Sequence, residues 1–191
     1  MDISTILVVA GLLIVVGYTI VIYNNLVSLK HNVSKNLANI DVLLKQRHEE
    51  LPKLISTCKQ YMQHERETLE RVIDARNSVQ SAQQQQDVRA LGQAETKLRT
   101  GLGHLFALAE NYPDLKANQS FQRLQQRISV LESSIADRRE FYNDSVNLNN
   151  MRLEQFPDLI IARNLGFKDF DLLEFSDDEL KDIDIEQQFL R

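Results

Sequence analysis

The sequence predicts an all-α protein whose N-terminal transmembrane helix continues directly into an antiparallel, up-and-down helical bundle. Three observations support this fold class. The 18 residues from Ile6 to Tyr23 are almost wholly apolar, and no charged residue occurs between Ile3 and Leu29. Apolar residues then recur every three or four positions over most of the remaining chain, as on one face of a helix. The 191 residues include only 6 glycines, 3 prolines and no tryptophan, a composition that favours long helices over strands.

The apolar N-terminal stretch has the length of a membrane-spanning helix. About 18 to 20 apolar residues in a helix cross a hydrocarbon core of about 30 Å, so we expect residues 6–23 to span a membrane behind a short tail, residues 1–5. The alternative is a buried helix of a soluble protein. We do not expect a cleaved signal peptide, because residues 1–5 contain no lysine or arginine and no small-residue cleavage site follows the apolar run.

Charges on either side of this stretch predict its orientation. Lys30 and Lys35 follow the apolar run, whereas only Asp2 precedes it. Because positively charged flanks remain on the cytoplasmic side, we expect the N-terminus outside and the bundle in the cytoplasm, at a cell inner membrane. Ala10 and Gly17 share one helix face, where small residues let two spans approach.

The apolar pattern continues past the span without a turn signal. From Leu26 to Met62 it has a period of 3.6 residues, and it resumes from Leu69 to Val79. We therefore expect the membrane helix and the first domain helix to form one rod that reaches about Ala82. Pro52 lies inside this rod, where proline costs about 3 kcal/mol. Since the apolar phase is kept across Pro52, we expect a kink or a restart in place and not a reversal of the chain.

Two further long helices and a short fourth one complete the predicted bundle. The second helix runs from Val88 to about Asn111 and contains Gly101 and Gly103. We attribute these glycines to close helix packing and not to a phosphate-binding loop, because a third glycine and a preceding strand are missing.

The third helix follows the turn Tyr112-Pro113-Asp114 and has Asn118 or Ser120 as its N-cap. Its apolar residues, from Phe121 to Phe156, have a period of 3.5, typical of coiled-coil-like bundle packing. Pro157 ends it.

The chain after Pro157 carries a short amphipathic segment and an acidic tail. The short segment has five apolar residues, Leu159, Ile160, Ile161, Leu165 and Phe167. We expect it to fold back on the bundle, which then comprises residues 24–168; the alternative is a helix that lies in the lipid interface. Residues 169–191 hold nine acidic residues against Lys181 and Arg191, interleaved with large apolar ones. This composition is typical of a flexible tail that folds on a partner.

The charge distribution excludes a nucleic-acid-binding surface. The net charge of −5 comes from the acidic tail, and the rest of the chain is nearly balanced and has no basic cluster. The single cysteine, Cys58, has no partner for an internal disulfide and falls at a helical core position.

The sequence contains no pattern that predicts a catalytic site, a cofactor site or a metal site. His64-Glu65 begins a zinc-protease signature, but Thr68 stands where the second histidine is needed. The serines and acids that a catalytic triad requires are scattered along long helices. We therefore expect a protein that is not an enzyme and binds no cofactor.

Six polar residues stand out on the amphipathic helices, namely Asp41, Arg47, Arg76, Arg139, Asn143 and Asp144. One interpretation is a solvated face with pairs three or four residues apart, each worth about 0.2 to 0.5 kcal/mol. The other is an interhelical polar network or a shared contact surface.

Several segments, in order along the chain, resemble the LemA family. They include Asn39-Ile40-Asp41-Val42-Leu43-Leu44-Lys45, Leu51-Pro52, Tyr112-Pro113-Asp114-Leu115-Lys116-Ala117-Asn118, Phe141-Tyr142-Asn143-Asp144 and Leu165-Gly166-Phe167-Lys168. The similarity covers roughly residues 25–168. It implies an N-terminal membrane anchor and an antiparallel bundle, usually four-helical, with no established enzymatic activity. The chain departs from the pattern at Leu37 and Ala38, before Asn39, where family members often have a tryptophan.

These observations predict a single-pass membrane protein whose bundle acts as an interaction or scaffolding module, with the lipid bilayer and a second copy of the chain as partners. The alternative is a lipid-contacting or membrane-remodelling protein that uses the segment from Leu159 to Phe167. An enzyme is the third and weakest hypothesis.

Overall fold

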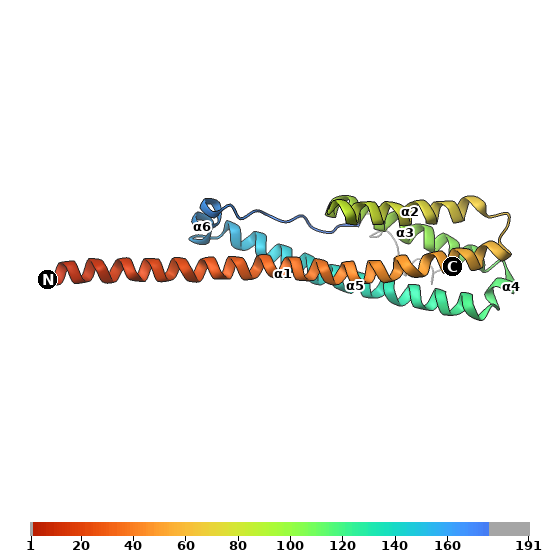
Figure 1. Cartoon of the computed structure of the whole chain (residues 1–191), viewed down its shortest axis with the longest axis horizontal. Helices are drawn as coiled ribbons and strands as arrows, with labels where there is room; N and C mark the ends of the chain where they lie inside the picture. The colour runs from red at the N-terminus through yellow and green to blue at the C-terminus, as the bar shows by residue number, and fades with distance from the viewer. Residues whose placement is uncertain (1, 176–191) are drawn as a thin grey trace, which may run out of the picture. The chain divides into compact units, whose positions relative to one another are not determined.

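The structure of the chain is a computed structural model, and it describes residues 2–175. In this part of the chain six helices follow one another and no strand occurs (Figure 1). The helices are α1 (Ile3–Tyr61), α2 (Arg66–Gln85), α3 (Val88–Ala109), α4 (Pro113–Lys116), α5 (Gln119–Glu154) and α6 (Asp158–Leu165). The predicted all-α class is confirmed.

The described residues form two compact units. Unit 1 contains residues 2–39 and 140–172, and unit 2 contains residues 40–139 and 173–175. Helices α1 and α5 each supply a segment to both units, while α2, α3 and α4 belong to unit 2 and α6 belongs to unit 1.

Helix α1 includes the predicted span and continues without a break beyond it. Every residue from 2 to 21 is exposed, and Ile22 is the first buried one. By length and composition, α1 is the one helix in the described chain that is long and apolar enough to cross a membrane, with a mean hydropathy of 2.7 over its most apolar 18 residues. Pro52 lies inside α1, and the helix continues past it to Tyr61.

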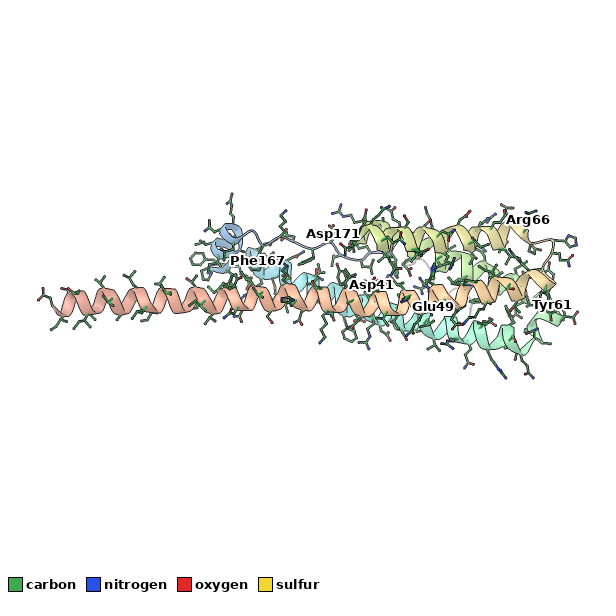
Figure 2. All side chains as sticks on the ribbon, in the orientation of Figure 1. Asp41, Glu49, Tyr61, Arg66, Phe167 and Asp171 are labelled. Atoms are coloured by element: carbon green, nitrogen blue, oxygen red, sulfur yellow. The ribbon has the colours of Figure 1, made fainter. Side chains whose placement is uncertain are left out.

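The chain reverses direction at a place where the sequence pattern shows no turn signal. Helix α1 ends at Tyr61 and α2 begins at Arg66, and these two residues lie on either side of the turn (Figure 2). Near the far end of α2, Gln83 Nε2 donates to Asp41 Oδ1 at 3.1 Å, so α2 runs antiparallel to α1. The expected rod to Ala82 is therefore wrong, and the fold has four long helices in place of three. Met62 is 1% exposed although it lies in the turn, so the apolar pattern runs across the reversal.

Helix α3 packs closely on α2, side by side with it (Figure 1). A Cβ on Gly101 would lie 3.4 Å from Val72 Cγ2, so the predicted close helix approach is confirmed there. Gly103 has no such neighbour within 4 Å, so close packing does not explain its presence. The N-cap of α3 is Asp87, whose side chain accepts a hydrogen bond from the Ala90 backbone N–H at 2.9 Å.

Helix α5 begins after α4, a single turn at the predicted Tyr112-Pro113-Asp114 reversal. Asn118 Oδ1 accepts hydrogen bonds from the backbone N–H groups of Ser120 and Phe121, at 2.8 and 3.1 Å, so Asn118 is the cap. Phe156, expected at the end of the apolar stripe, lies beyond the helix and is 81% exposed.

Part of the predicted flexible tail is packed against the protein. In unit 1, the Tyr142 hydroxyl donates to the Asp171 carbonyl at 2.9 Å. In unit 2, Leu173 is 1% exposed, and a Cβ on Gly92 of α3 would lie 2.1 Å from the Glu174 carbonyl oxygen. The rest of the predicted tail, residues 176–191, lies outside the described residues.

Candidate functional site

The six polar residues singled out in the sequence do not form a single cluster. Asp41, Arg47, Arg76 and Arg139 belong to unit 2, and Asn143 and Asp144 belong to unit 1. Arg47 alone among them is fully buried. Asn143 is half-buried and Asp144 is exposed on α5. The interhelical interpretation and the solvated interpretation therefore apply to different members of the set.

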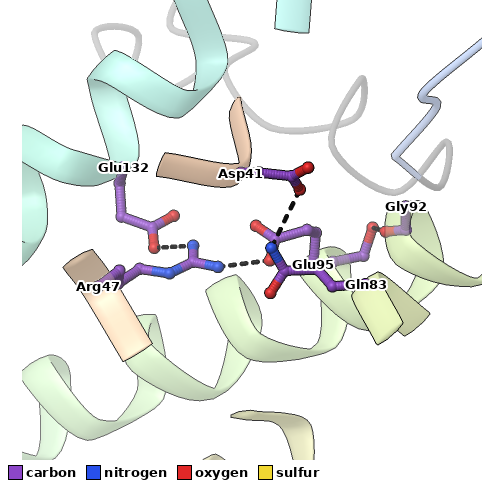
Figure 3. A network of polar contacts seen from close by, with 7 residues as sticks. Asp41, Arg47, Gln83, Gly92, Glu95 and Glu132 are labelled. Carbon is purple, nitrogen blue, oxygen red and sulfur yellow. Dashed lines mark hydrogen bonds and ion pairs between the residues drawn. The ribbon is translucent and has the colours of Figure 1, made fainter. Parts of the chain in front are cut away.

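Arg47 joins three helices inside unit 2. Its guanidinium donates from Nη1 to Glu132 Oε1 on α5 at 2.5 Å and from Nη2 to Glu95 Oε1 on α3 (Figure 3). The side chains of Arg47 and Glu95 are 1% and 3% exposed, and that of Glu132 is 20% exposed. Arg47 lies between Leu44 and Leu51 on the buried face of α1. The spacing of the apolar stripe suggests His48 for this step, but the structure buries Arg47 there and leaves His48 only partly buried.

The charges of this Arg47 cluster do not cancel, because two carboxylates face one guanidinium. Burial lowers the pKa of Arg47, but the charges of Glu95 and Glu132 and their hydrogen bonds outweigh burial and leave it raised. Burial raises the pKa of Glu95, although Arg47 acts in the opposite direction. The cluster joins α1, α3 and α5 through charge-assisted hydrogen bonds.

Glu95 was missed in the sequence although a signal was present. It occupies a position between Leu91 and Leu98 that is buried on α3, so it interrupts an apolar stripe as Arg47 does on α1. A charge on the buried face of one helix calls for an opposite charge on another. Pairing Glu95 on α3 with Arg47 on α1, the two charged residues on buried helix faces, predicts their contact.

The other polar residues of unit 2 make contacts nearer the surface. On α2, Arg76 Nη2 lies 2.6 Å from His48 Nε2, and Arg76 Nε donates to the His48 carbonyl at 3.3 Å. Burial, together with the charge of Arg76, lowers the pKa of His48. The guanidinium carbon of Arg139 lies 3.8 Å from the centroid of the Phe175 ring, a cation–π contact with the C-terminal segment.

No residue group in the described chain is arranged for metal binding, since no three or more His, Cys, Asp or Glu side chains converge in residues 2–175. Cys58 is fully buried in α1, and burial raises the pKa of its thiol to about 11. A thiol of this kind is protonated near neutral pH and is a poor nucleophile.

In unit 1, the predicted amphipathic segment is α6 and the residues that follow it. Ile161 and Phe167 pack on a small core of Ile22, Leu26, Leu153 and Ala162. Tyr23 and Phe167 make an edge-to-face ring contact with centroids 6.0 Å apart, and Phe167 lies beside α1 (Figure 2). The other three predicted residues, Leu159, Ile160 and Leu165, are 45%, 53% and 56% exposed. The segment thus covers α1 with one side and leaves large apolar side chains uncovered on the other.

A cavity of about 640 Å³ opens between α1 and residues 165–170, next to the C-terminal end of α6. Its wall includes three aromatic residues, Tyr23, Phe167 and Phe170, and three basic residues, Lys30, His31 and Lys168. The cavity lies wholly within unit 1.

Comparison with known proteins identifies the relatives of this chain. Magnetosome protein MamQ 2 and Magnetosome protein MamQ 1 of Paramagnetospirillum magneticum are each 30% identical to it over 80 residues, which is 42% of this chain and 29% of each relative. Magnetosome protein MamQ of Magnetospirillum gryphiswaldense is 29% identical over 80 residues, with the same shares covered. The chain thus matches less than a third of the length of these curated relatives.

The family comparison covers much more of the chain. The model of the LemA family matches residues 36–187, well over half of the sequence. The match begins after the membrane-length stretch and extends beyond Lys168, where the recognisable motifs end. With one apolar helix of membrane length ahead of an all-α bundle, the chain belongs to the LemA family.

Proposed function

We propose that this protein is anchored in an inner membrane by a single transmembrane helix. Its helical bundle acts as an interaction or scaffolding module and associates with further copies of itself. The observation that carries the proposal is the state of α1. Residues 2–21 are exposed, uncharged from Ile3 onward and mostly apolar, and no described residue packs over them. Exposing so many large apolar side chains to water is unfavourable, at about 25 cal/mol per Å², whereas a bilayer covers them at no such cost.

The continuity of α1 supports a scaffolding role more than a catalytic one. The same helix that is exposed at its N-terminal end supplies Leu44, Arg47 and Leu51 to the core of unit 2. Because no loop interrupts α1, the bundle is joined to its anchor through helix and not through a flexible linker. A module joined in this way stays close to the membrane, where it can meet partners.

Membrane extraction and crosslinking of the full-length chain test the proposal. We expect the protein to stay in the membrane pellet at alkaline pH and Leu13→Arg to release it, because a charge near the helix centre costs about 2.5 to 3.5 kcal/mol. Leu13→Ile, which keeps the position apolar, is the matched control. Crosslinking in intact membranes should capture copies of the chain or partner proteins. A chain captured only as a monomer, with no partner, would exclude the scaffolding role.

A second candidate function is contact with the lipid surface through α6. It is favoured by the exposed side chains of Leu159, Ile160 and Leu165, which lie on a helix packed at Ile22, where the exposed part of α1 ends. In full-length protein, a fluorophore on Ile160→Cys should be quenched by lipids that carry a doxyl group. A fluorophore on Ser34→Cys, about 18 Å further along α1 than Ile22, is the control and should be quenched much less. Equal quenching at both sites would exclude the interfacial position.

A further inference from the structure

The cavity of unit 1 has the chemistry of an anion site. Lys30, His31 and Lys168 contribute to its wall, and Asp169 is the one acidic residue among the residues that line it. None of the three basic side chains makes an ion pair with any other residue in the range 2–175. The two lysines supply two positive charges and Asp169 one negative charge, so the cavity has an excess of positive charge available to a ligand even without a contribution from His31.

The loop that carries Lys168 is held in place by side chains of α5. Asn150 Oδ1 accepts a hydrogen bond from the Phe170 backbone N–H at 3.0 Å, and Asn150 Nδ2 donates to the Phe170 carbonyl at 2.9 Å. The Tyr142 hydroxyl holds the Asp171 carbonyl. Lys168 therefore approaches the cavity from a positioned backbone, which reduces the entropy lost when a ligand binds.

The cavity also lies at a defined depth relative to the apolar end of α1. Tyr23 is the last residue of the predicted span and lines the cavity, and aromatic rings of this kind favour the level of the lipid headgroups. Lys30 is the first charged residue after Asp2. At about 1.5 Å per residue it lies about 9 Å beyond Asn24 along the helix. Headgroup layers extend about 5 to 8 Å from the hydrocarbon core, and a lysine side chain reaches back toward them.

We propose that this cavity binds the phosphate group of an anionic membrane lipid, with Lys30, His31 and Lys168 as its donors and with Tyr23 and Phe167 against the start of the acyl chains. Lysine is a common phosphate ligand because its ammonium group is a compact positive charge with three donors. The proposal rests on the proposed function, because the lipid reaches the cavity only if α1 spans the bilayer. Binding at this cavity gives the anchor a preference for anionic lipid that the apolar helix alone does not have.

The test is lipid binding by the full-length protein in non-ionic detergent, measured by native mass spectrometry. The probes are dihexanoyl phosphatidylglycerol, dihexanoyl phosphatidylcholine and inorganic phosphate. We expect phosphatidylglycerol to bind best. Each of Lys30→Gln and Lys168→Gln should weaken it by about fivefold, the equivalent of about 1 kcal/mol for a lysine near an anionic surface. Asp169→Asn, which removes the one negative charge of the lining, should strengthen the binding.

Lys35→Gln is the matched control, because Lys35 is an exposed lysine of α1 that does not line the cavity. Circular dichroism of each variant verifies that the helices are formed. An equal loss with Lys35→Gln, or no loss with Lys30→Gln and Lys168→Gln, would overturn the proposal in favour of general surface charge. If inorganic phosphate binds as tightly as the lipid and depends on both lysines in the same way, the ligand is free phosphate and the proposed lipid is wrong.

Extraction of the same variants separates this proposal from the anchor itself. If wild-type protein stays in the alkaline membrane pellet but does not prefer phosphatidylglycerol, the anion site alone fails. If wild-type protein is released from the membrane, the proposed function fails, and with it the source of the lipid.

Discussion

Arg47 Nη1 lies 2.5 Å from Glu132 Oε1 in the interior of unit 2, and 1% of the arginine side chain is exposed. The same guanidinium also donates to Glu95 of α3, so one buried cation ties α1 to two other helices. Arg47 Nε has no hydrogen-bond partner among the described residues. A buried pair of this type contributes little net stability but is costly to break. Its main consequence is therefore the alignment of α1 with α3 and α5.

Replacing Arg47 should destabilise the bundle more than any surface change. Arg47→Met leaves two buried or half-buried carboxylates without a cation, and removal of one partner of a buried ion pair costs about 3 to 5 kcal/mol. The free energy of unfolding, measured by urea denaturation of the full-length protein in detergent, should fall by this amount. Lys45→Met, at an exposed position of the same helix, is the control and should change it by less than about 0.5 kcal/mol. Equal stability of the two variants would show that the buried contact does not form.

The position of Arg47 shows what sequence patterns predict well and what they miss. The apolar stripe from Leu26 to Met62 predicts a helix and its buried face. Between Leu44 and Leu51 the spacing fits His48 as well as Arg47, and the structure buries Arg47. The stripe does not reveal the partner, because the choice between Glu95, Glu132 and other acids depends on how three helices are aligned. That alignment results from the reversal after Tyr61, which the continuous apolar pattern concealed.

The cavity of unit 1 could not be predicted from the sequence for a similar reason. Leu159, Ile160, Ile161, Leu165 and Phe167 were recognised as an amphipathic set. Their division into a covered and an exposed side depends on where α6 meets α1, at Ile22 and Leu26. Lys30 and Lys168 are 138 positions apart in the sequence, and only the fold places both at one cavity.

Protonation of His48 should weaken the fold as the pH is lowered. Burial and the charge of Arg76 lower the pKa of His48 in the folded protein, whereas in the unfolded chain it is about 6.5. Below about pH 6.5 the unfolded chain therefore takes up a proton that the folded protein does not, and stability falls with pH until the folded pKa is passed. Urea denaturation at pH 7.5 and 5.5 should show a smaller loss for His48→Gln than for wild type. An equal or larger loss in the variant would contradict this assignment.

Gly92 should be intolerant of a side chain, unlike another glycine on the same helix. A Cβ at Gly92 would lie 2.1 Å from the Glu174 carbonyl oxygen, so Gly92→Ala has to displace the segment that contains Leu173. We expect a loss of about 1 to 3 kcal/mol in the free energy of unfolding, with faster hydrogen exchange at residues 173–175. Gly103→Ala has open space and should stabilise α3 by about 1 kcal/mol. If both variants are equally stable, the segment does not lie on α3.

Cys58 should not react with thiol reagents while the protein is folded. Its side chain is buried and its pKa is raised to about 11, so at pH 7.5 almost no thiolate is present or accessible. Maleimide labelling of native full-length protein should therefore be very slow and should become complete in urea. Ser34→Cys, at an exposed position of α1, should react within minutes under native conditions. Rapid native labelling of wild-type protein would mean that the core around Cys58 is open.

Because Cys58 should not react in the folded protein, the side of the membrane on which the bundle lies can be measured with one added cysteine. If Lys30 and Lys35 lie in the cytoplasm, as the positive-inside rule predicts, a maleimide that does not cross membranes should not reach Ser34→Cys in intact cells and should label it after permeabilisation. Thr5→Cys, ahead of the apolar stretch, should show the opposite behaviour and be labelled in intact cells. Labelling of Ser34→Cys in intact cells would show that the orientation is opposite to the predicted one. It would also place the cavity of Lys30 and Lys168 against the outer leaflet, where the attraction of anionic cytoplasmic lipids is absent.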